Sequence, residues 1–89
     1  MEIDFRPVVR LTTPDAYGVW LLTELDPLDF DTASGLADYG LGPELEVFSL
    51  ADLREVRGIE GLPIEIDPTF VAEHTLKGYL KAMSGQGAL

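Results

Sequence analysis

The sequence of 89 residues contains no cysteine, which excludes a disulfide framework and a thiolate metal centre. It also lacks a long apolar run. Its longest uncharged stretches, residues 16–23 and 82–89, are far shorter than the ~20 residues that span a bilayer. The N-terminal residues carry neither the basic region nor the apolar segment of a signal peptide. We therefore expect a cytoplasmic protein with no membrane association.

Basic residues are scarce: six Lys and Arg stand against 16 Asp and Glu, for a net charge of −10. No Lys or Arg occurs between residues 11 and 53, a stretch that carries nine acids. These are Asp15, Glu24, Asp26, Asp29, Asp31, Asp38, Glu44, Glu46 and Asp52. A negative field of this kind repels nucleic acids and anionic membranes and attracts basic protein surfaces. We expect a basic protein partner and no direct contact with nucleic acid.

The chain has room for one domain only, and its apolar content of 46% is enough for one core. The sequence predicts a single α+β domain over residues 1–83. Residues 84–89 contain two glycines and are predicted to form a flexible tail. The oligomeric state, monomer or dimer, stays open.

Alternating apolar and polar residues over positions 2–11 predict a half-buried strand. Pro7 cannot donate a ladder hydrogen bond, so it indicates an edge strand or an irregular start. Further strands are predicted over residues 17–24, 33–39, 44–50 and 62–67. Trp20, in the second of these, is predicted to lie in the core.

Two helices complete the predicted fold. Ser49 and Asp52 resemble a capping box that opens a helix of about eight residues, which Gly58 would stop. A C-terminal helix is predicted over residues 74–83, where four apolar residues recur at helical spacing: Leu76, Tyr79, Leu80 and Met83. The predicted fold class is therefore α+β, with a four- to five-stranded, mainly antiparallel sheet, one short helix and a C-terminal helix.

Several short motifs follow one another along the chain: Thr13-Pro14-Asp15, Trp20-Leu21-Leu22-Thr23-Glu24, Gly35-Leu36-Ala37-Asp38, Pro43-Glu44-Leu45, Ser49-Leu50, Val56-Arg57-Gly58 and Gly61-Leu62-Pro63-Ile64-Glu65. In these residues the chain resembles a small bacterial family of unknown function, encoded on plasmids, conjugative elements and prophages near DNA-processing genes. It differs in lacking a basic N-terminal extension, and Ile66-Asp67 stands where Arg-Asp is expected. The resemblance implies a mobile-element setting and no enzyme activity.

Candidates for chemistry are few. His74 is the only histidine, lies beside Glu73 and is not part of a metal-binding helix motif, so we interpret it as an ordinary helix residue. Asp26, Asp29 and Asp31 supply hard oxygen ligands, but the spacing of a calcium-binding EF-hand loop is absent. We expect no catalytic residues, no metal site and no cofactor, and we leave open whether these three aspartates hold a cation.

The acidic surface is the stronger candidate site. Alternate residues of a strand point to one side about 6.6–6.8 Å apart, so Glu44 and Glu46 would resemble neighbouring phosphates of a nucleic acid strand. Phe30, flanked by acids in a loop, could add an apolar anchor. With the neighbouring acids they would form one flank of the molecule. The predicted partner-binding residues are Glu24, Asp26, Asp29, Phe30, Asp31, Asp38, Glu44 and Glu46.

These observations predict a non-catalytic protein of a mobile genetic element. Its expected activity is to inhibit a host nucleic-acid-targeting defence complex, as anti-CRISPR and anti-restriction proteins do, by occupying the basic surface that binds nucleic acid. One alternative is an accessory protein of plasmid transfer or replication that binds a helicase or primase. Another is a small enzyme, which would need acids converging on a pocket around His74.

Overall fold

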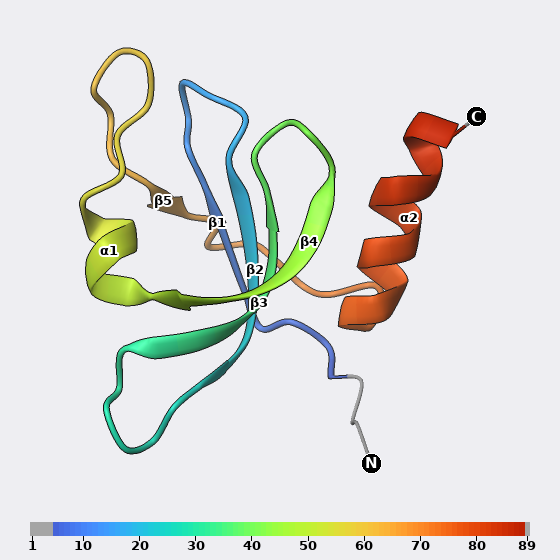
Figure 1. Ribbon diagram of the computed structural model, residues 1–89, viewed down its shortest axis with the longest axis horizontal. Coiled ribbons are helices and arrows are strands. Elements are labelled where there is room, and N and C mark those ends of the chain that lie inside the picture. Colours follow the sequence, from blue (N-terminus) through green and yellow to red (C-terminus); the bar gives the residue numbers. More distant parts are fainter. Residues whose placement is uncertain (1–4, 89) are drawn as a thin grey trace.

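The computed structural model describes residues 5–88, which form one five-stranded sheet and two helices (Figure 1). The elements in chain order are β1 (Val9–Thr12), β2 (Val19–Leu25), β3 (Thr32–Asp38), β4 (Pro43–Ser49), α1 (Leu50–Arg54), β5 (Glu65–Ile66) and α2 (Leu76–Ala88). The strand order across the sheet is β4-β3-β2-β1-β5, and every pair is antiparallel. The predicted α+β fold is confirmed.

The first strand is shorter than predicted. Among the described residues it begins at Val9, and residues 2–4 of the predicted strand lie outside the described residues. Pro7 is fully buried just before it and has no N–H for a ladder. The irregular start that this proline indicated is therefore confirmed. β1 lies between β2 and the very short β5, so it is not itself the edge.

Both helices differ in length from their predictions. α1 ends at Arg54, well before Gly58, because the amide of Glu55 turns back to the carbonyls of Asp52 and Leu53 and the chain then leaves toward an isolated bridge between Arg57 and Pro63. α2 continues past the predicted end at Met83 to Ala88. The predicted tail over 84–89 is thus helical through residue 88, and Leu89 lies outside the described residues.

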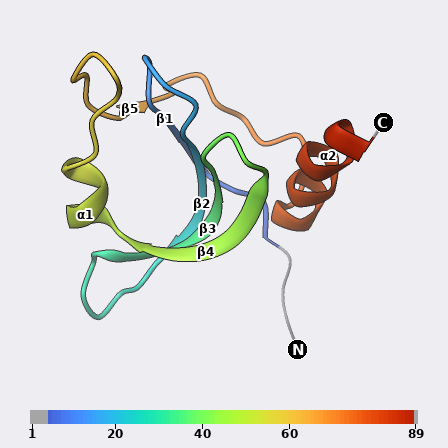
Figure 2. The same cartoon turned by 45° about the horizontal axis from the view of Figure 1, so that its top comes forward.

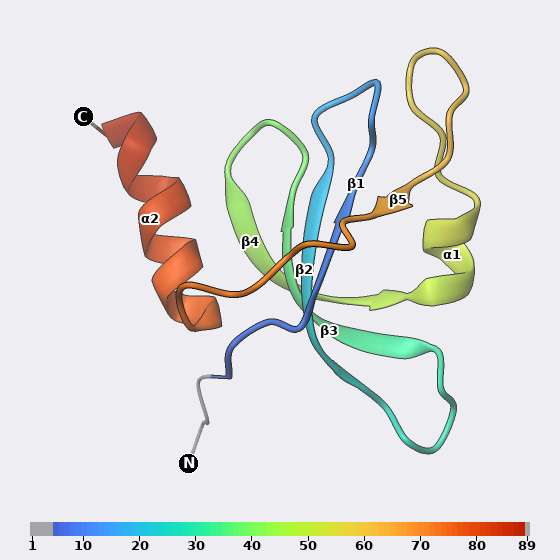
Figure 3. The ribbon, with the colours of Figure 1, turned by 180° about the vertical axis from the view of Figure 1, so that it is seen from behind.

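The sheet is curved, and α1 and α2 lie on opposite sides of it (Figures 2 and 3). On the α1 face, directly paired residues of neighbouring strands place Leu11, Trp20 and Ala37 in one row. This row is buried together with Phe48 and the α1 residue Leu53. Trp20 is 2% exposed, which confirms its predicted place in the core. We call this side of the sheet the α1 face and the other the α2 face.

The α2 face is covered by the C-terminal helix, which contacts β3 and β4. Leu21 and Leu36 pair directly on this face and are both buried. The four apolar residues predicted to line one side of the helix are all partly buried: Leu76, Tyr79, Leu80 and Met83. Apolar residues are therefore buried on both faces of the sheet, one set beneath α1 and the other beneath α2.

Candidate acidic binding surface

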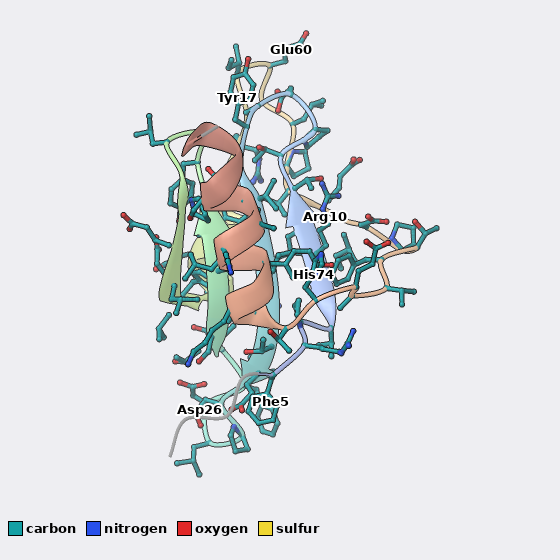
Figure 4. The ribbon with its side chains drawn as sticks, turned by 90° about the vertical axis from the view of Figure 1, so that its right-hand side faces the viewer. Phe5, Arg10, Tyr17, Asp26, Glu60 and His74 are labelled. Atoms are coloured by element: carbon teal, nitrogen blue, oxygen red, sulfur yellow. The ribbon has the colours of Figure 1, made fainter. Side chains whose placement is uncertain are left out.

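The predicted acidic residues do not form one flank. Asp26, in the β2–β3 loop, lies at one end of the molecule near Phe5, whereas Tyr17 and Glu60 mark the opposite end (Figure 4). The β3–β4 turn that follows Asp38 is separated from the β2–β3 loop by the full length of β3, about 20 Å for seven residues. The acids therefore act as separate groups with different surroundings.

The aspartates of the β2–β3 loop bind the backbone of their own loop. Asp26 accepts a hydrogen bond from the Leu28 amide at 2.8 Å. Asp29 accepts from the Asp31 amide, the Thr32 amide and, at 2.6 Å, the Thr32 hydroxyl. The Thr32 hydroxyl, more than any other partner, lowers the pKa of the exposed Asp29 below its usual value. These carboxylates order the loop.

Asp31 lies in the β2–β3 loop, but its carboxylate binds the start of α1. One carboxylate oxygen accepts from the Ser49 hydroxyl at 2.6 Å, and the other accepts from the Ala51 amide at 2.8 Å. Its backbone carbonyl accepts from the Leu50 amide, and the Ser49 hydroxyl accepts from Asp52. Asp31 and Ser49 together satisfy the first three amides of α1, which otherwise lack partners. The capping role of Ser49 was predicted, and that of Asp31 was not.

Asp38 has a similar local role at the other end of β3. Its carboxylate accepts from the Gly40 amide at 2.8 Å and from the Gly42 amide at 3.3 Å. Both glycines have positive φ angles, of 97° and 116°, in the turn between β3 and β4. The Asp38 charge therefore lies over a tight turn.

Glu44 and Glu46 behave differently from the aspartates. They are opposite Ala37 and Gly35 of β3, so they share the α1 face, as the alternation of the strand predicted. Glu44 is exposed and accepts no hydrogen bond from any residue that the structure describes. Glu24 follows an irregularity in the β2–β3 register and is opposite Ser34, which places it on the α2 face. The pair Glu44 and Glu46 is the acidic feature that internal contacts leave most available.

Tyr39 is the neighbour that positions Glu46. Its hydroxyl donates to Glu46 at 3.4 Å, and its ring meets Trp20 edge to face at 5.7 Å. Burial raises the pKa of Tyr39, and the negative charges of Glu46 and Glu44 raise it further. The phenol therefore keeps its proton at neutral pH and remains a donor to Glu46.

Phe30 is exposed and has an unusual backbone. Its side chain is 71% exposed and its φ is 51°, the left-handed region that a bulky residue adopts at a cost of roughly 1 kcal/mol. Its amide donates to the Asp26 carbonyl at 2.8 Å, which closes one helical turn of the loop. Leu28 beside it is 92% exposed. The loop thus presents two apolar side chains to solvent, and the role of Phe30 as an anchor stays a prediction.

The sequence reasoning missed Asp15. Its carboxylate accepts from the Glu60 amide at 2.6 Å and lies so close over Gly58 that a Cβ at this position would collide with it. Asp15 therefore joins the β1–β2 turn to the loop after α1. The signal was present in the motifs, because Thr13-Pro14-Asp15 and Val56-Arg57-Gly58 both belong to the resemblance. The contact between these two motifs could not be predicted, because they lie far apart in the sequence.

Side chains typical of an active site or a metal site are not clustered among the residues that the structure describes. His74 is exposed and stacks edge to face on Tyr79 at 5.1 Å, and no carboxylate of the described residues forms a hydrogen bond or ion pair with it. Among residues 5–88, no three His, Asp or Glu side chains are placed to hold a metal ion, and this includes Asp26, Asp29 and Asp31. Neither helix in this region has the length and apolar character to cross a bilayer.

A shallow apolar groove of ≈ 400 Å³ lies on the α1 face between β1, β2, α1 and the segment leading to β5. Its lining is almost wholly aliphatic: Val9, Leu11, Leu22, Leu50, Leu53, Pro63, Ile64 and Ile66, with Arg54 at the side. It contains no nucleophile and no acid–base pair, so it offers an apolar contact and no reaction chemistry.

Comparison with known proteins places the chain in a family whose function is not known. Two curated relatives, imidazolonepropionases from two strains of Bacteroides fragilis, are each 34% identical over 56 residues. That match covers 63% of this chain, which spans only 13% of the length of these relatives. No solved structure matches the chain. Over its whole length, residues 1–89, the chain matches the model of the family described as "Protein of unknown function (DUF2958)", and it belongs to that family.

Proposed function

We propose that this protein is a non-catalytic inhibitor carried by a mobile genetic element. Its target is a nucleic-acid-targeting defence complex, such as a CRISPR effector or a restriction enzyme. In this proposal β4 presents Glu44 and Glu46 to the basic surface of that complex and competes with nucleic acid for it.

One observation carries the proposal. Glu44 and Glu46 follow each other on one face of an outer strand, while most of the predicted aspartates bind the backbone of the protein itself. Two carboxylates at strand spacing, about 6.6–6.8 Å, are comparable to two successive phosphates. No lysine or arginine between residues 11 and 53 is present to neutralise them. The net charge of −10 adds long-range attraction to a basic partner.

The test uses bacterial strains that each carry one defined CRISPR or restriction system, challenged with a plasmid which that system targets. Expression of the wild-type chain should raise transformation by at least about tenfold in one or more strains. The double variant Glu44→Lys/Glu46→Lys should return transformation to the empty-vector level, because reversed charges repel a basic surface. Circular dichroism should show that this variant remains folded.

A matched control separates the β4 surface from total charge. Glu60→Lys/Glu73→Lys changes exposed residues outside β4 and, like the β4 variant, brings the net charge from −10 to −6. It should retain most of the inhibition. Equal loss in both double variants would reject the β4 surface. Two results together would favour the accessory role over inhibition. The chain would raise plasmid transformation in none of the strains, and the tagged chain would retain a helicase or primase after low-salt washes.

A further inference from the structure

The two edges of the sheet differ in what they offer to another chain. β5 is an edge of only two residues. β4 is an edge of seven residues, paired with β3 on one side only, and it forms the outer border of the sheet beside α2 (Figure 4). A long edge strand presents unpaired backbone donors and acceptors, which is a template for another extended segment. Natural proteins blunt such edges unless they use them.

The register shows which backbone groups of β4 turn outward. Leu50 donates its amide to the Asp31 carbonyl, directly after the paired residues Thr32 and Ser49. Since bonded and non-bonded pairs alternate in an antiparallel ladder, Glu44 and Glu46 direct their backbone groups toward β3. Leu45 and Val47 then direct theirs to the open side. Pro43 falls in the same outward series, where a missing N–H removes no ladder bond.

The side chains of β4 alternate in chemistry between the two faces. Leu45 and Val47 lie on the α2 face and remain 48% and 67% exposed although α2 packs nearby. Glu44 and Glu46 lie on the α1 face and form no ion pair with any described residue. A strand that pairs with β4 would therefore meet carboxylates on one of its faces and aliphatic groups on the other.

We infer that the β4 edge binds an extended segment of the partner in which basic and apolar residues alternate. The segment adds a sixth strand to the sheet: its backbone bonds to Leu45 and Val47, and its Lys or Arg side chains are opposite Glu44 and Glu46. Those positions are non-hydrogen-bonded pairs on this side, where opposing side chains approach most closely. This inference rests on the proposed function and specifies how the basic partner is recognised.

The same glutamates disfavour a second copy of this chain as the occupant. Antiparallel pairing of two β4 strands around Leu45 or Glu46 would place glutamate opposite glutamate, and like charges directly opposite destabilise a pair of strands. A segment with Lys or Arg at those positions replaces this repulsion with attraction. The charge pattern of the edge thus selects against self-association and for a basic strand.

The experiment uses the full chain and synthetic peptides of about ten residues. One peptide alternates lysine and valine, a second alternates glutamate and valine, and a third is the lysine–valine peptide methylated on the backbone nitrogens of its bonding edge. Fluorescence anisotropy should show binding of the first peptide and at least about tenfold weaker binding of the others. Hydrogen exchange of the Leu45 and Val47 amides should slow in the first complex. Equal binding of the methylated peptide would overturn strand addition.

Two variants complete the test. Val47→Pro removes one outward-directed amide N–H and keeps every charge. It should weaken binding of the lysine–valine peptide at least about tenfold. Glu44→Lys/Glu46→Lys should reverse the preference toward the glutamate–valine peptide. If Val47→Pro loses the peptide but still inhibits the defence complex, this inference fails and the proposed function stands. If the peptide binds as expected but the chain raises plasmid transformation in none of the strains, the proposed function fails and the edge inference stands. Sedimentation could instead show that the wild-type chain dimerises and that Val47→Pro abolishes the dimer. That result would identify a second copy as the occupant and overturn the inference.

Discussion

The aspartates and the glutamates of the acidic middle of this chain differ in what their oxygens contact. Asp15, Asp29, Asp31 and Asp38 each accept two or more hydrogen bonds from loops, turns or the start of α1. Glu44 accepts none from the described residues, and Glu46 accepts only the 3.4 Å bond of Tyr39. The short aspartate side chain suits local backbone capping, whereas glutamate on a strand reaches outward. A count of acids therefore overstates the surface that is available for a partner.

The largest expected effect is that of removing Asp31, because this residue joins the β2–β3 loop to α1. Asp31→Ala should lower the free energy of unfolding by about 2–3 kcal/mol, since the Ala51 amide and the Ser49 hydroxyl lose a charged acceptor. Urea unfolding at pH 7 measures this. Asp52→Ala, in the first turn of the same helix, is the matched control and should cost much less. Equal costs would show that Asp31 is not the principal cap.

A second large effect is expected where Asp15 lies over Gly58. Gly58→Ala should cost about 2 kcal/mol of unfolding free energy, because the added methyl group collides with the Asp15 carboxylate. In an Asp15→Ala background the same substitution should cost clearly less. A double-mutant cycle in urea measures this coupling. Additive costs would place the effect of Gly58→Ala in its own backbone and not in the contact with Asp15.

These two contacts also show where sequence reasoning stops. The alternation of β4, the Ser49 cap and the apolar stripe of α2 are local patterns, and all three were predicted. Asp31 meets Ala51 across 20 residues and Asp15 meets Glu60 across 45. No periodicity reports such contacts, so Asp31 was assigned to a partner surface and Asp15 was overlooked.

The single acidic flank failed as a prediction for a related reason. It assumed that acids near one another in sequence share a side of the molecule. The irregular register after Leu22 instead moves Glu24 to the α2 face, while Glu44 and Glu46 remain on the α1 face. A bulge reverses which side of the sheet the following residues face, and no sequence pattern in residues 19–25 predicts this bulge. The binding role of each residue stays a prediction.

A smaller effect concerns acid pH. The Thr32 hydroxyl lowers the pKa of Asp29, and the Thr69 amide lowers that of Asp67, below the ordinary value of 3.8. Groups with a depressed pKa in the folded state add stability above that ordinary value, and the protein loses it as the pH falls through the folded pKa. Thermal unfolding should therefore show Tm decreasing as the pH falls below about 4. Asp29→Asn should make this decrease shallower, and an unchanged slope would contradict the role of Asp29.

The smallest expected effect on stability is that of neutralising the β4 pair. Glu44→Gln/Glu46→Gln changes the net charge from −10 to −8 and removes no hydrogen bond that holds a loop or helix. The free energy of unfolding should stay within about 0.5 kcal/mol of the wild type, or rise slightly as the repulsion between the two carboxylates is relieved. Urea unfolding beside Asp31→Ala makes the comparison direct. If the proposed function is right, this stable variant should nevertheless lose inhibition, which a residue kept for folding alone would not do. A cost comparable to that of Asp31→Ala would instead place the β4 glutamates with the aspartates, among the residues that build the fold.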